Sequence, residues 1–302
     1  MTRTNELRLK EYLAEKKALV EMALDGLLPG EELYPPVIFQ AARYSLMAGG
    51  KRLRPILCLA AAEAVGGKAE AVMPVACALE LIHTYSLIHD DLPAMDNDDY
   101  RRGKLTSHKV FGEDIAILAG DALLTEALNL HARRDLMPDV PPERLLDVTR
   151  EGSEAAGWFG MVAGQVLDIR SEGKTVDVKT LQQIHRLKTG AMIRVSLRAG
   201  AILSGASAAA LASLSDYGRQ IGLAFQIADD ILNVEGDRAL LGKGTGSDAA
   251  RGKVTFPALL GVEASRARAK ALIGKAVASL ASFDEQAAPL RLIALYILER
   301  KS

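Results

Sequence analysis

Apolar residues recur at three- and four-residue spacings through most of this chain, which is the period of an α-helix. The clearest examples are residues 7–24, 72–91, 114–134 and 217–234. Alanine and leucine are abundant, while the alternating runs typical of strands are scarce. The breaks are short, and there is no flexible linker and no repeat of fixed period. We therefore predict an all-α protein in which residues 1–302 form a single domain of roughly ten or more helices.

The composition excludes several classes of protein. Of the 302 residues, 49% are hydrophobic, which is ample for a sizeable core. The net charge is −1, so no general attraction to nucleic acid or to anionic membranes is expected. The least polar long run, residues 199–214, is rich in small residues and short for a membrane span. We predict a protein that neither binds nucleic acid nor inserts into a membrane.

The two cysteines and the N-terminus indicate a cytoplasmic location. Cys58 and Cys77 lie in apolar surroundings, and we expect buried free thiols rather than a disulfide or a metal pair. The first twenty residues mix charges from the start and contain no apolar core of the signal-peptide type. Both observations fit a reducing compartment.

An acidic cluster stands at the end of one apolar helix. Residues 87–99 contain five aspartates: Asp90, Asp91, Asp96, Asp98 and Asp99. Pro93 should stop the helix near Asp90, because proline lacks an N–H group and clashes with the preceding turn. Carboxylates are unfavourable at a helix C-terminus, where the macrodipole is negative. A solvated acidic loop is the plainer interpretation, but a leucine- and isoleucine-rich segment leads directly into the cluster. We therefore predict bound Mg²⁺, which prefers carboxylate oxygens.

A second acidic cluster lies inside another apolar helix. Asp229 and Asp230 are adjacent, and Asn233 shares a face with Asp229. Gln226 lies one turn earlier on the same side. Adjacent acids in an apolar helix are costly when they are buried without partners. We predict that the two clusters face each other across a cavity and share a metal-bound anion.

Basic residues follow each acidic cluster. Arg101 and Arg102 come directly after the first, and Lys243 and Lys253 come after the second on a glycine-rich segment. Lys188, with Thr189, lies beside a helix break. Any one of these cations could be an ordinary solvated charge. The repeated order of acid and then base instead indicates a diphosphate that is held by both metal and cations.

A separate basic set contains no carboxylate. Lys51, Arg52 and Arg54 follow a Gly-Gly turn, and His83 lies seven residues before Asp90, two turns down the same helix. Such a set can hold an anion directly, without metal. The sequence thus predicts two different anion sites, which suggests two anionic substrates and one reaction.

Six segments together resemble one known family. They are residues 49–55, 83–103, 160–169, 188–193, 225–237 and 252–261. In order and content they resemble the trans-isoprenyl diphosphate synthases, most closely the bacterial farnesyl diphosphate synthases. The aspartates in the order DDxxxxD, followed by RRG, are the most specific part. The resemblance implies an all-α bundle around a deep central cavity, a homodimer and about three Mg²⁺ ions.

The resemblance also implies roles for individual residues. The metal ligands would be Asp90, Asp96 and Asp229, supported by Asp91 and Asp230. The allylic diphosphate would be gripped by Arg101, Lys188, Lys243 and Lys253. Isopentenyl diphosphate would be bound by Lys51, Arg54, His83 and Arg102, and the reacting centre would be lined by Thr189 and Gln226. One departure is Asn233, because the family often has a third aspartate at this position of the second cluster.

The implied reaction is condensation of isopentenyl diphosphate with dimethylallyl or geranyl diphosphate. Metal and cations stabilise the departing diphosphate, and the allylic cation is attacked by the double bond of isopentenyl diphosphate. Tyr85 lies five residues before Asp90, about 7.5 Å along the helix. In the resembling family an aromatic residue here, beside small Ser86, limits the product to farnesyl diphosphate. Ordinary core packing is the plainer role for Tyr85, and geranylgeranyl diphosphate is the alternative product.

Other activities explain less of the sequence. HD-type phosphohydrolases also use His and Asp on helices, and His83, His89 and Asp90 could serve there. The remaining histidines form no evident cluster: His108, His131 and His185. A terpene cyclase would not need the second anion site. A non-catalytic regulatory subunit would be expected to lose acids from one cluster, and both clusters are present apart from Asn233.

Overall fold

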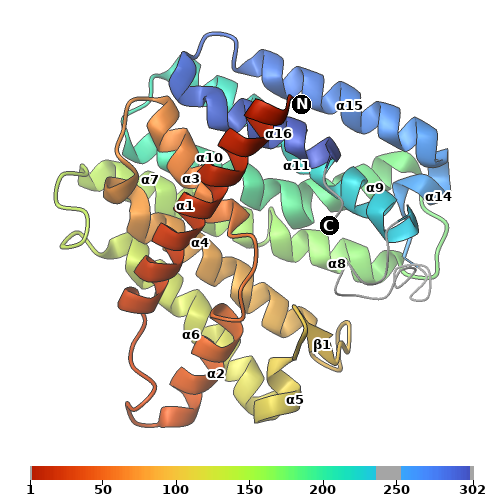
Figure 1. The fold of residues 1–302 in the computed structure, drawn as a ribbon. Coiled ribbons are helices and arrows are strands. Elements are labelled where there is room, and N and C mark those ends of the chain that lie inside the picture. The colour runs from red at the N-terminus through yellow and green to blue at the C-terminus, as the bar shows by residue number, and fades with distance from the viewer. Residues whose placement is uncertain (1, 236–252, 300–302) are drawn as a thin grey trace.

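Most of the described chain is helical; in this computed structural model it comprises residues 2–235 and 253–299 (Figure 1). The first helices are α1 (Arg3–Leu27), α2 (Pro36–Leu46), α3 (Leu53–Ala64), α4 (Ala69–Asp90), α5 (Ser107–Phe111), α6 (Glu113–Ala132) and α7 (Pro142–Ala156). They are followed by α8 (Met161–Ser171), α9 (Val178–His185), α10 (Ala191–Leu203), α11 (Ala208–Glu235), α14 (Phe256–Leu260), α15 (Val262–Ser279) and α16 (Ala288–Glu299). A π-helical turn joins α9 to α10, and a 3₁₀ turn precedes α16. The all-α prediction is confirmed, while the single domain stays a prediction.

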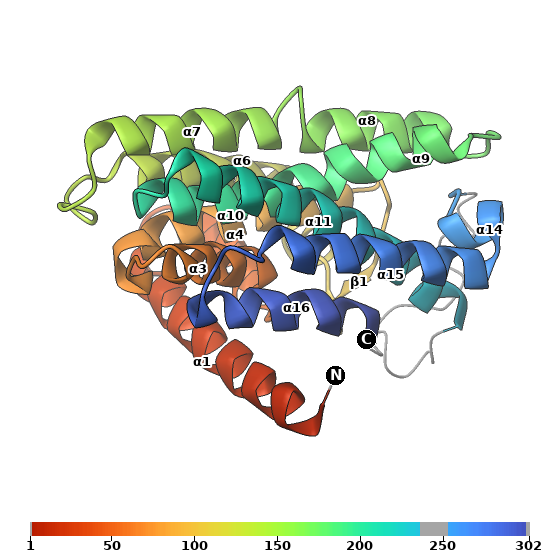
Figure 2. The same cartoon turned by 90° about the horizontal axis from the view of Figure 1, so that it is seen from above.

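The central helix is α4. It buries residues on every side, because its sequence is apolar almost throughout. Its side chains join those of α6, α7 and α10 in the largest apolar cluster. A second cluster packs α3, α10, α11, α15 and α16 together, and a third joins α9, α11, α14 and α15. Figure 2 shows α7 and α8 along one side of the molecule and α1 on the opposite side, with α4, α10 and α11 between them.

Two helices are long and apolar enough to cross a membrane, by length and composition alone: α4 and α6. In α4, 72% of the most apolar window is buried inside the protein, so its hydrophobicity is explained by its place in the core. In α6, only 39% of that window is buried. Burial in the core therefore does not explain the apolar residues on the exposed face of α6.

The two thiols lie in the core, as predicted. Cys58 on α3 and Cys77 on α4 are free and fully buried. Burial raises the pKa of Cys77 to about 12 and also raises that of Cys58. Neither thiol is therefore suited to act as a nucleophile near neutral pH.

The contact between α3 and α10 depends on Gly200. A Cβ at this position would overlap the main-chain oxygen of Cys58. Gly200→Ala should therefore lower the free energy of unfolding by about 1–3 kcal/mol, the usual cost of overpacking. Gly274→Ala on α15 is the control, because no atom lies within 4 Å of where its Cβ would stand. The control should be neutral or stabilise by up to about 1 kcal/mol. Equal urea midpoints for the two variants would contradict this prediction.

Candidate active site

The first acidic segment folds back onto the end of α4. The helix ends at Asp90, three residues before Pro93, as expected. The Asp96 amide then donates to the Asp90 carbonyl oxygen at 2.8 Å, and the Asn97 amide donates to the Leu92 carbonyl oxygen at 3.1 Å. The loop therefore returns to the helix end and brings Asp96 back beside Asp90.

The two aspartate pairs are built on the same plan. The first member of each pair accepts a hydrogen bond from a glutamine side chain. Gln165 Nε2 lies 2.8 Å from Asp90 Oδ1, and Gln226 Nε2 lies 3.3 Å from Asp229 Oδ2. Adjacent residues on a helix point about 100° apart, so the second member of each pair has different neighbours.

The second member of each pair is buried and holds a neighbouring segment. Asp91 is 3% exposed and accepts hydrogen bonds from Arg101, with Nε at 2.8 and 2.7 Å from its two oxygens. Asp230 is 7% exposed and accepts a hydrogen bond from the Phe256 amide at 2.8 Å. Asp91 thus fixes the segment that carries Arg101, and Asp230 fixes the segment that begins with Lys253.

Burial perturbs Asp90 strongly. It raises the pKa of this carboxyl to about 6, with Lys188 and Arg101 opposing the rise and Asp96 and Asp91 adding to it. A buried carboxylate beside others is costly as an anion unless a cation approaches it. Asp90 is therefore a suitable ligand for a hard divalent metal ion.

A short hairpin carries the two arginines that follow the first cluster. Strand β1 (Tyr100–Arg101) pairs antiparallel with β2 (Lys104–Leu105), a feature that sequence periodicity did not predict. The two turn residues, Arg102 and Gly103, have φ of 54° and 77°, as a tight type I′ turn requires. Arg101 and Arg102 therefore leave the hairpin in different directions.

Arg102 reaches the glycine turn that precedes Lys51. Its guanidinium donates to the Gly49 carbonyl oxygen and lies directly against Gly50. Gly50 has φ of 123°, a backbone conformation that L side chains rarely adopt, so the turn needs glycine at this position. The hairpin thus links the first acidic cluster to the predicted metal-free anion site.

The predicted metal-free set is strongly basic. Burial lowers the pKa of Arg54 to about 10; Glu80 opposes this and Arg102 adds to it. The pKa of His83 is lowered well below its usual value. Burial is the largest cause, and the positive charges of four arginines add to it: Arg54, Arg102, Arg101 and Arg52. His83 is therefore a neutral hydrogen-bonding group beside several guanidinium groups. Lys51 is exposed and lines a 260 Å³ pocket together with Phe225, the residue before Gln226.

Glu80 was not predicted as part of this region. It is 1% exposed on α4, and its Oε1 lies 2.9 Å from Nη1 of fully buried Arg52. Arg52 also donates from Nη2 to the Leu46 carbonyl oxygen at 2.7 Å. Arg52 therefore points into the core. In the sequence, Glu80 could have been noticed as an acidic residue within an apolar stretch of helix.

The two lysines predicted to grip the allylic diphosphate, Lys188 and Lys253, converge on Asp168. Lys188 comes from the π-helical turn (Arg186–Gly190) and places Nζ 2.7 Å from Asp168 Oδ2. Lys253 Nζ lies 3.9 Å from the same oxygen and 3.2 Å from Asp96 Oδ1. π-Helical turns like the one that carries Lys188 are frequent at functional sites. Gly164 lets α8 approach this turn, because a Cβ there would overlap the Lys188 backbone.

Sequence reasoning missed Gln165 and Asp168. They lie three residues apart on α8, and so on one face of the helix, inside a segment that carried the family resemblance. That spacing was the available signal. Lys243, another predicted grip on the diphosphate, lies outside the described residues.

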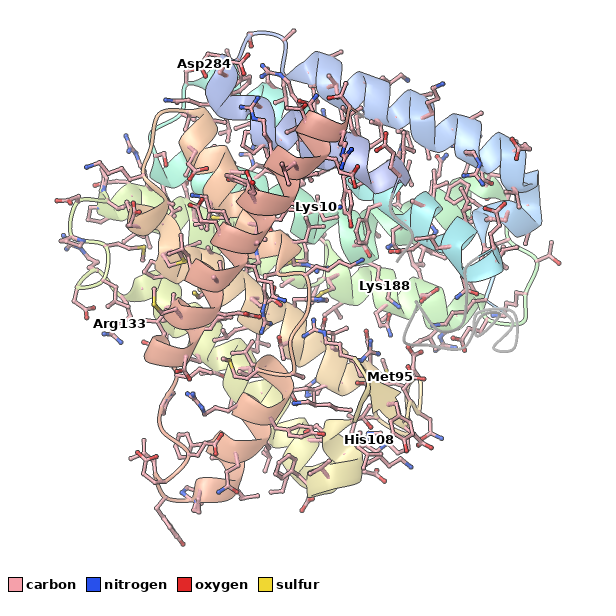
Figure 3. All side chains as sticks on the ribbon, viewed as in Figure 1. Lys10, Met95, His108, Arg133, Lys188 and Asp284 are labelled. Carbon is pink, nitrogen blue, oxygen red and sulfur yellow. The ribbon has the colours of Figure 1, made fainter. Side chains whose placement is uncertain are left out.

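The two acidic clusters meet across residues 253–256. Lys253 contacts Asp96 of the first cluster, and the Phe256 amide donates to Asp230 of the second. Four consecutive residues span at most about 11 Å between their Cα atoms. The predicted juxtaposition of the two clusters therefore agrees with this geometry. Figure 3 labels Met95, in the acidic loop, and Lys188 on the other side of the site.

The donor set fits Mg²⁺ better than a metal held by protein alone. Within residues 2–235 and 253–299, no group of three or more His, Cys, Asp or Glu side chains could hold a metal ion. Mg²⁺ usually takes one or two carboxylates and completes its shell with waters and phosphate oxygens. Asp90 and Asp96, which the loop brings together at the end of α4, could supply such carboxylates.

Comparison with known proteins decides the family. The sequence profile of the family described as polyprenyl synthetase matches residues 35–288. The chain belongs to this family. It is therefore a prenyltransferase that makes trans-prenyl diphosphates. The sequence-based recognition is confirmed.

Similar proteins carry several product names. The chain is 51% identical over 293 residues to a dimethylallyltranstransferase of Fischerella ambigua (strain UTEX 1903), covering 97% of this chain and 84% of that protein. It is 46% identical to the farnesyl diphosphate synthase of Geobacillus stearothermophilus, with coverage of 98% and 99%. Among solved structures, an FPP/GFPP synthase from Zymomonas mobilis has a TM-score of 0.86 at 39% identity, with coverage of 97% and 99%. A geranylgeranyl pyrophosphate synthetase from Pyrococcus horikoshii Ot3 reaches 0.87 at 33% identity, with the same coverage.

Proposed function

We propose that this protein is a Mg²⁺-dependent farnesyl diphosphate synthase. It would condense isopentenyl diphosphate, head to tail (1′-4), with dimethylallyl and geranyl diphosphates and release diphosphate. The main support is the pairing of two unlike anion sites through one hairpin. Arg101 belongs to the carboxylate-rich site, whereas its neighbour Arg102 belongs to the arginine-rich site. Two such sites suit two diphosphate substrates that react with each other.

Asp90 and Asp96 would hold metal on one side of the allylic diphosphate, and Asp229 on the other, with about three Mg²⁺ ions in all. When bound, the metal stabilises the negative charge of the departing diphosphate. Asp91 and Asp230 would support these ligands by holding the segments next to them. Asn233 would not add charge to the set.

The side chains of the protein would then bind and orient the two substrates. Lys188, Lys253 and Arg101, with Lys243, would grip the allylic diphosphate as its C–O bond breaks. Thr189 and Gln226 would line the allylic carbon that carries the positive charge. A new C–C bond forms when the isopentenyl double bond attacks that carbon, and the proton lost afterwards passes to the released diphosphate.

The second site would hold isopentenyl diphosphate directly. Arg54, Arg102 and Lys51 would pair with its charge, and neutral His83 would donate a hydrogen bond. His83 lies two turns before Asp90 on α4. The same helix would therefore contact the diphosphate groups of both substrates.

Tyr85 and Ser86 would limit the product to farnesyl diphosphate. Tyr85 is 7% exposed on α4, and its ring meets the His89 ring edge to face at 5.8 Å. The Ser86 hydroxyl donates to the His83 carbonyl oxygen at 2.8 Å, so this small side chain stays close to its own helix. A bulky ring one turn below Asp90 favours a short product. Geranylgeranyl diphosphate is the alternative.

A homodimer would cover an exposed apolar face, and we propose a cytoplasmic enzyme of this form. The face is formed by α6, α7 and the turn between α7 and α8, and α7 contacts both α6 and α8 along one side of the molecule (Figure 2). Its large exposed side chains are Ile117, Leu118, Leu128, Leu146, Trp158 and Phe159. Large apolar side chains gathered at the surface are typical of an interaction surface.

Light scattering coupled to gel filtration tests the dimer. The expected mass is twice the 32.3 kDa of one chain. Leu118→Lys should shift the protein toward the monomer, because it would bury an unpaired charge in the interface. Leu7→Lys, at another exposed leucine on α1, is the control and should leave the mass unchanged. A monomeric wild-type protein at micromolar concentration would contradict the dimer.

The activity is tested by incubating the purified protein with isopentenyl diphosphate and geranyl diphosphate. Farnesyl diphosphate is expected when Mg²⁺ is present, and chelation by EDTA should abolish its formation until Mg²⁺ is restored. Mass spectrometry identifies the prenyl chain. A longer chain would favour the geranylgeranyl alternative. No condensation product from any allylic primer would refute the synthase and favour a regulatory subunit; release of inorganic phosphate from nucleotides would instead indicate a phosphohydrolase.

A further inference from the structure

His185 lies at a junction of three elements beside the proposed allylic site. It is the last residue of α9 and is 9% exposed. Its Nε2 lies 3.4 Å from Asp230 Oδ2 on α11. Its ring stacks on the Phe256 ring of α14, with centroids 5.6 Å apart and planes at 26°. The Phe256 amide closes the triangle, because it donates to the same Asp230 oxygen at 2.8 Å.

Each member of this triangle is close in sequence to a residue of the site. His185 comes three residues before Lys188, Asp230 directly follows Asp229, and Phe256 comes three residues after Lys253. Because so few residues lie between, the backbone has little freedom to move Lys188, Asp229 or Lys253 away from the triangle. The position of the triangle therefore sets the spacing of two lysines and a carboxylate.

The triangle is also rigid. Phe256 is completely buried in the apolar cluster that joins α9, α11, α14 and α15. The guanidinium carbon of Arg268 lies 5.6 Å from the centroid of its ring, so a cation from α15 holds the same ring. Because the ring is buried among several helices, it provides a fixed reference for His185.

We propose that His185 is a positioning residue for the group that grips the allylic diphosphate. The proposal rests on the proposed function. His185 does not touch substrate: acting through Asp230 and Phe256, it keeps Lys188, Lys253 and Asp229 at the spacing that one diphosphate requires. A misplacement of about 1 Å in such a group is enough to reduce turnover substantially. The isopentenyl diphosphate site, built on α3, α4 and the hairpin, is separate from this triangle.

The test measures the KM for each of the two substrates separately. His185→Ala removes both contacts, while His185→Phe keeps the stacked ring but loses the nitrogen next to Asp230. The control is Gln183→Ala, at an exposed residue on the same helix. His185→Ala should raise the KM for geranyl diphosphate about 10-fold, the size typical of losing an outer support of a metal or anion site. The KM for isopentenyl diphosphate should stay within twofold of wild type.

A binding experiment separates this proposal from the proposed function. Calorimetric titration with inorganic pyrophosphate in the presence of Mg²⁺ requires no turnover, so it applies even to a chain that makes no prenyl product. His185→Ala should weaken pyrophosphate binding about 10-fold, with His185→Phe between it and wild type. Asp230→Asn combined with His185→Phe should cost less than the sum of the two single changes, because both remove one contact.

Two results would overturn the role of His185. One is pyrophosphate affinity within twofold of wild type in both His185 variants. The other is an equal rise in KM for both substrates, which indicates a general loss of structure. Thermal unfolding of each variant shows whether it is folded, and His185→Phe, which retains the ring in the apolar cluster, is the variant expected to stay folded if His185→Ala does not.

Discussion

Asp90→Ala should lower kcat for condensation by at least about 100-fold. Losing one group that stabilises charge in the transition state commonly costs about 10²–10³ in kcat, and Asp90 is proposed to act through a metal ion as well. The change removes a buried carboxyl that accepts a hydrogen bond from Gln165 and whose pKa is raised to about 6. Removing a group that is costly to bury as an anion should leave the fold intact.

Steady-state turnover with geranyl and isopentenyl diphosphates at saturating Mg²⁺ measures this effect. Asp99→Ala is the matched control in the same acidic segment, because Asp99 is 60% exposed and pairs with Lys109 at 2.8 Å. It should keep kcat within a few-fold of wild type. Equal activity of Asp90→Ala and Asp99→Ala would remove Asp90 from the proposed metal site.

Tyr85→Ala should lengthen the main product from C15 to C20 or beyond. The ring fills space in the central apolar cluster below Asp90, and alanine would leave that space open to a longer prenyl chain. Removing a buried aromatic ring also costs stability, by about 3–5 kcal/mol. Product length should be measured by mass spectrometry at a temperature at which the variant stays folded.

Tyr85→Phe is the control for this change. It keeps the ring and its contact with His89 and should still give C15. If Tyr85→Ala also gives only C15, the ring is core packing and the limit to chain length lies elsewhere. A C20 product from the wild type would support the geranylgeranyl alternative instead.

Helices and the end of α4 could be predicted because local forces decide them. The apolar period marks the helices, and Pro93 marks where the central helix must stop. The prediction of an anion site beside Asp90 rests on charge, because five aspartates lie close together and two arginines follow them. The β1–β2 hairpin escaped prediction because each strand has two residues, too few for any alternating pattern.

The different contacts of the two aspartates in each pair could not be predicted. Helical geometry requires Asp90 and Asp91 to point in different directions, but which one faces a partner depends on where Gln165 and Arg101 arrive. Asp168 was missed for a related reason, because its two lysine partners are 20 and 85 residues away. Such pairs are set by tertiary packing, so the three-residue spacing of Gln165 and Asp168 indicates a shared helix face but not the partners of that face.

The hairpin that carries Arg101 and Arg102 has a thermodynamic consequence. One arginine is bound to Asp91 and the other to the glycine turn, so a ligand that draws either guanidinium also moves its neighbour. Occupation of one site should therefore change the affinity of the other, and by reciprocity the effect must be equal in both directions. We expect the affinity for each diphosphate to change when the other is bound.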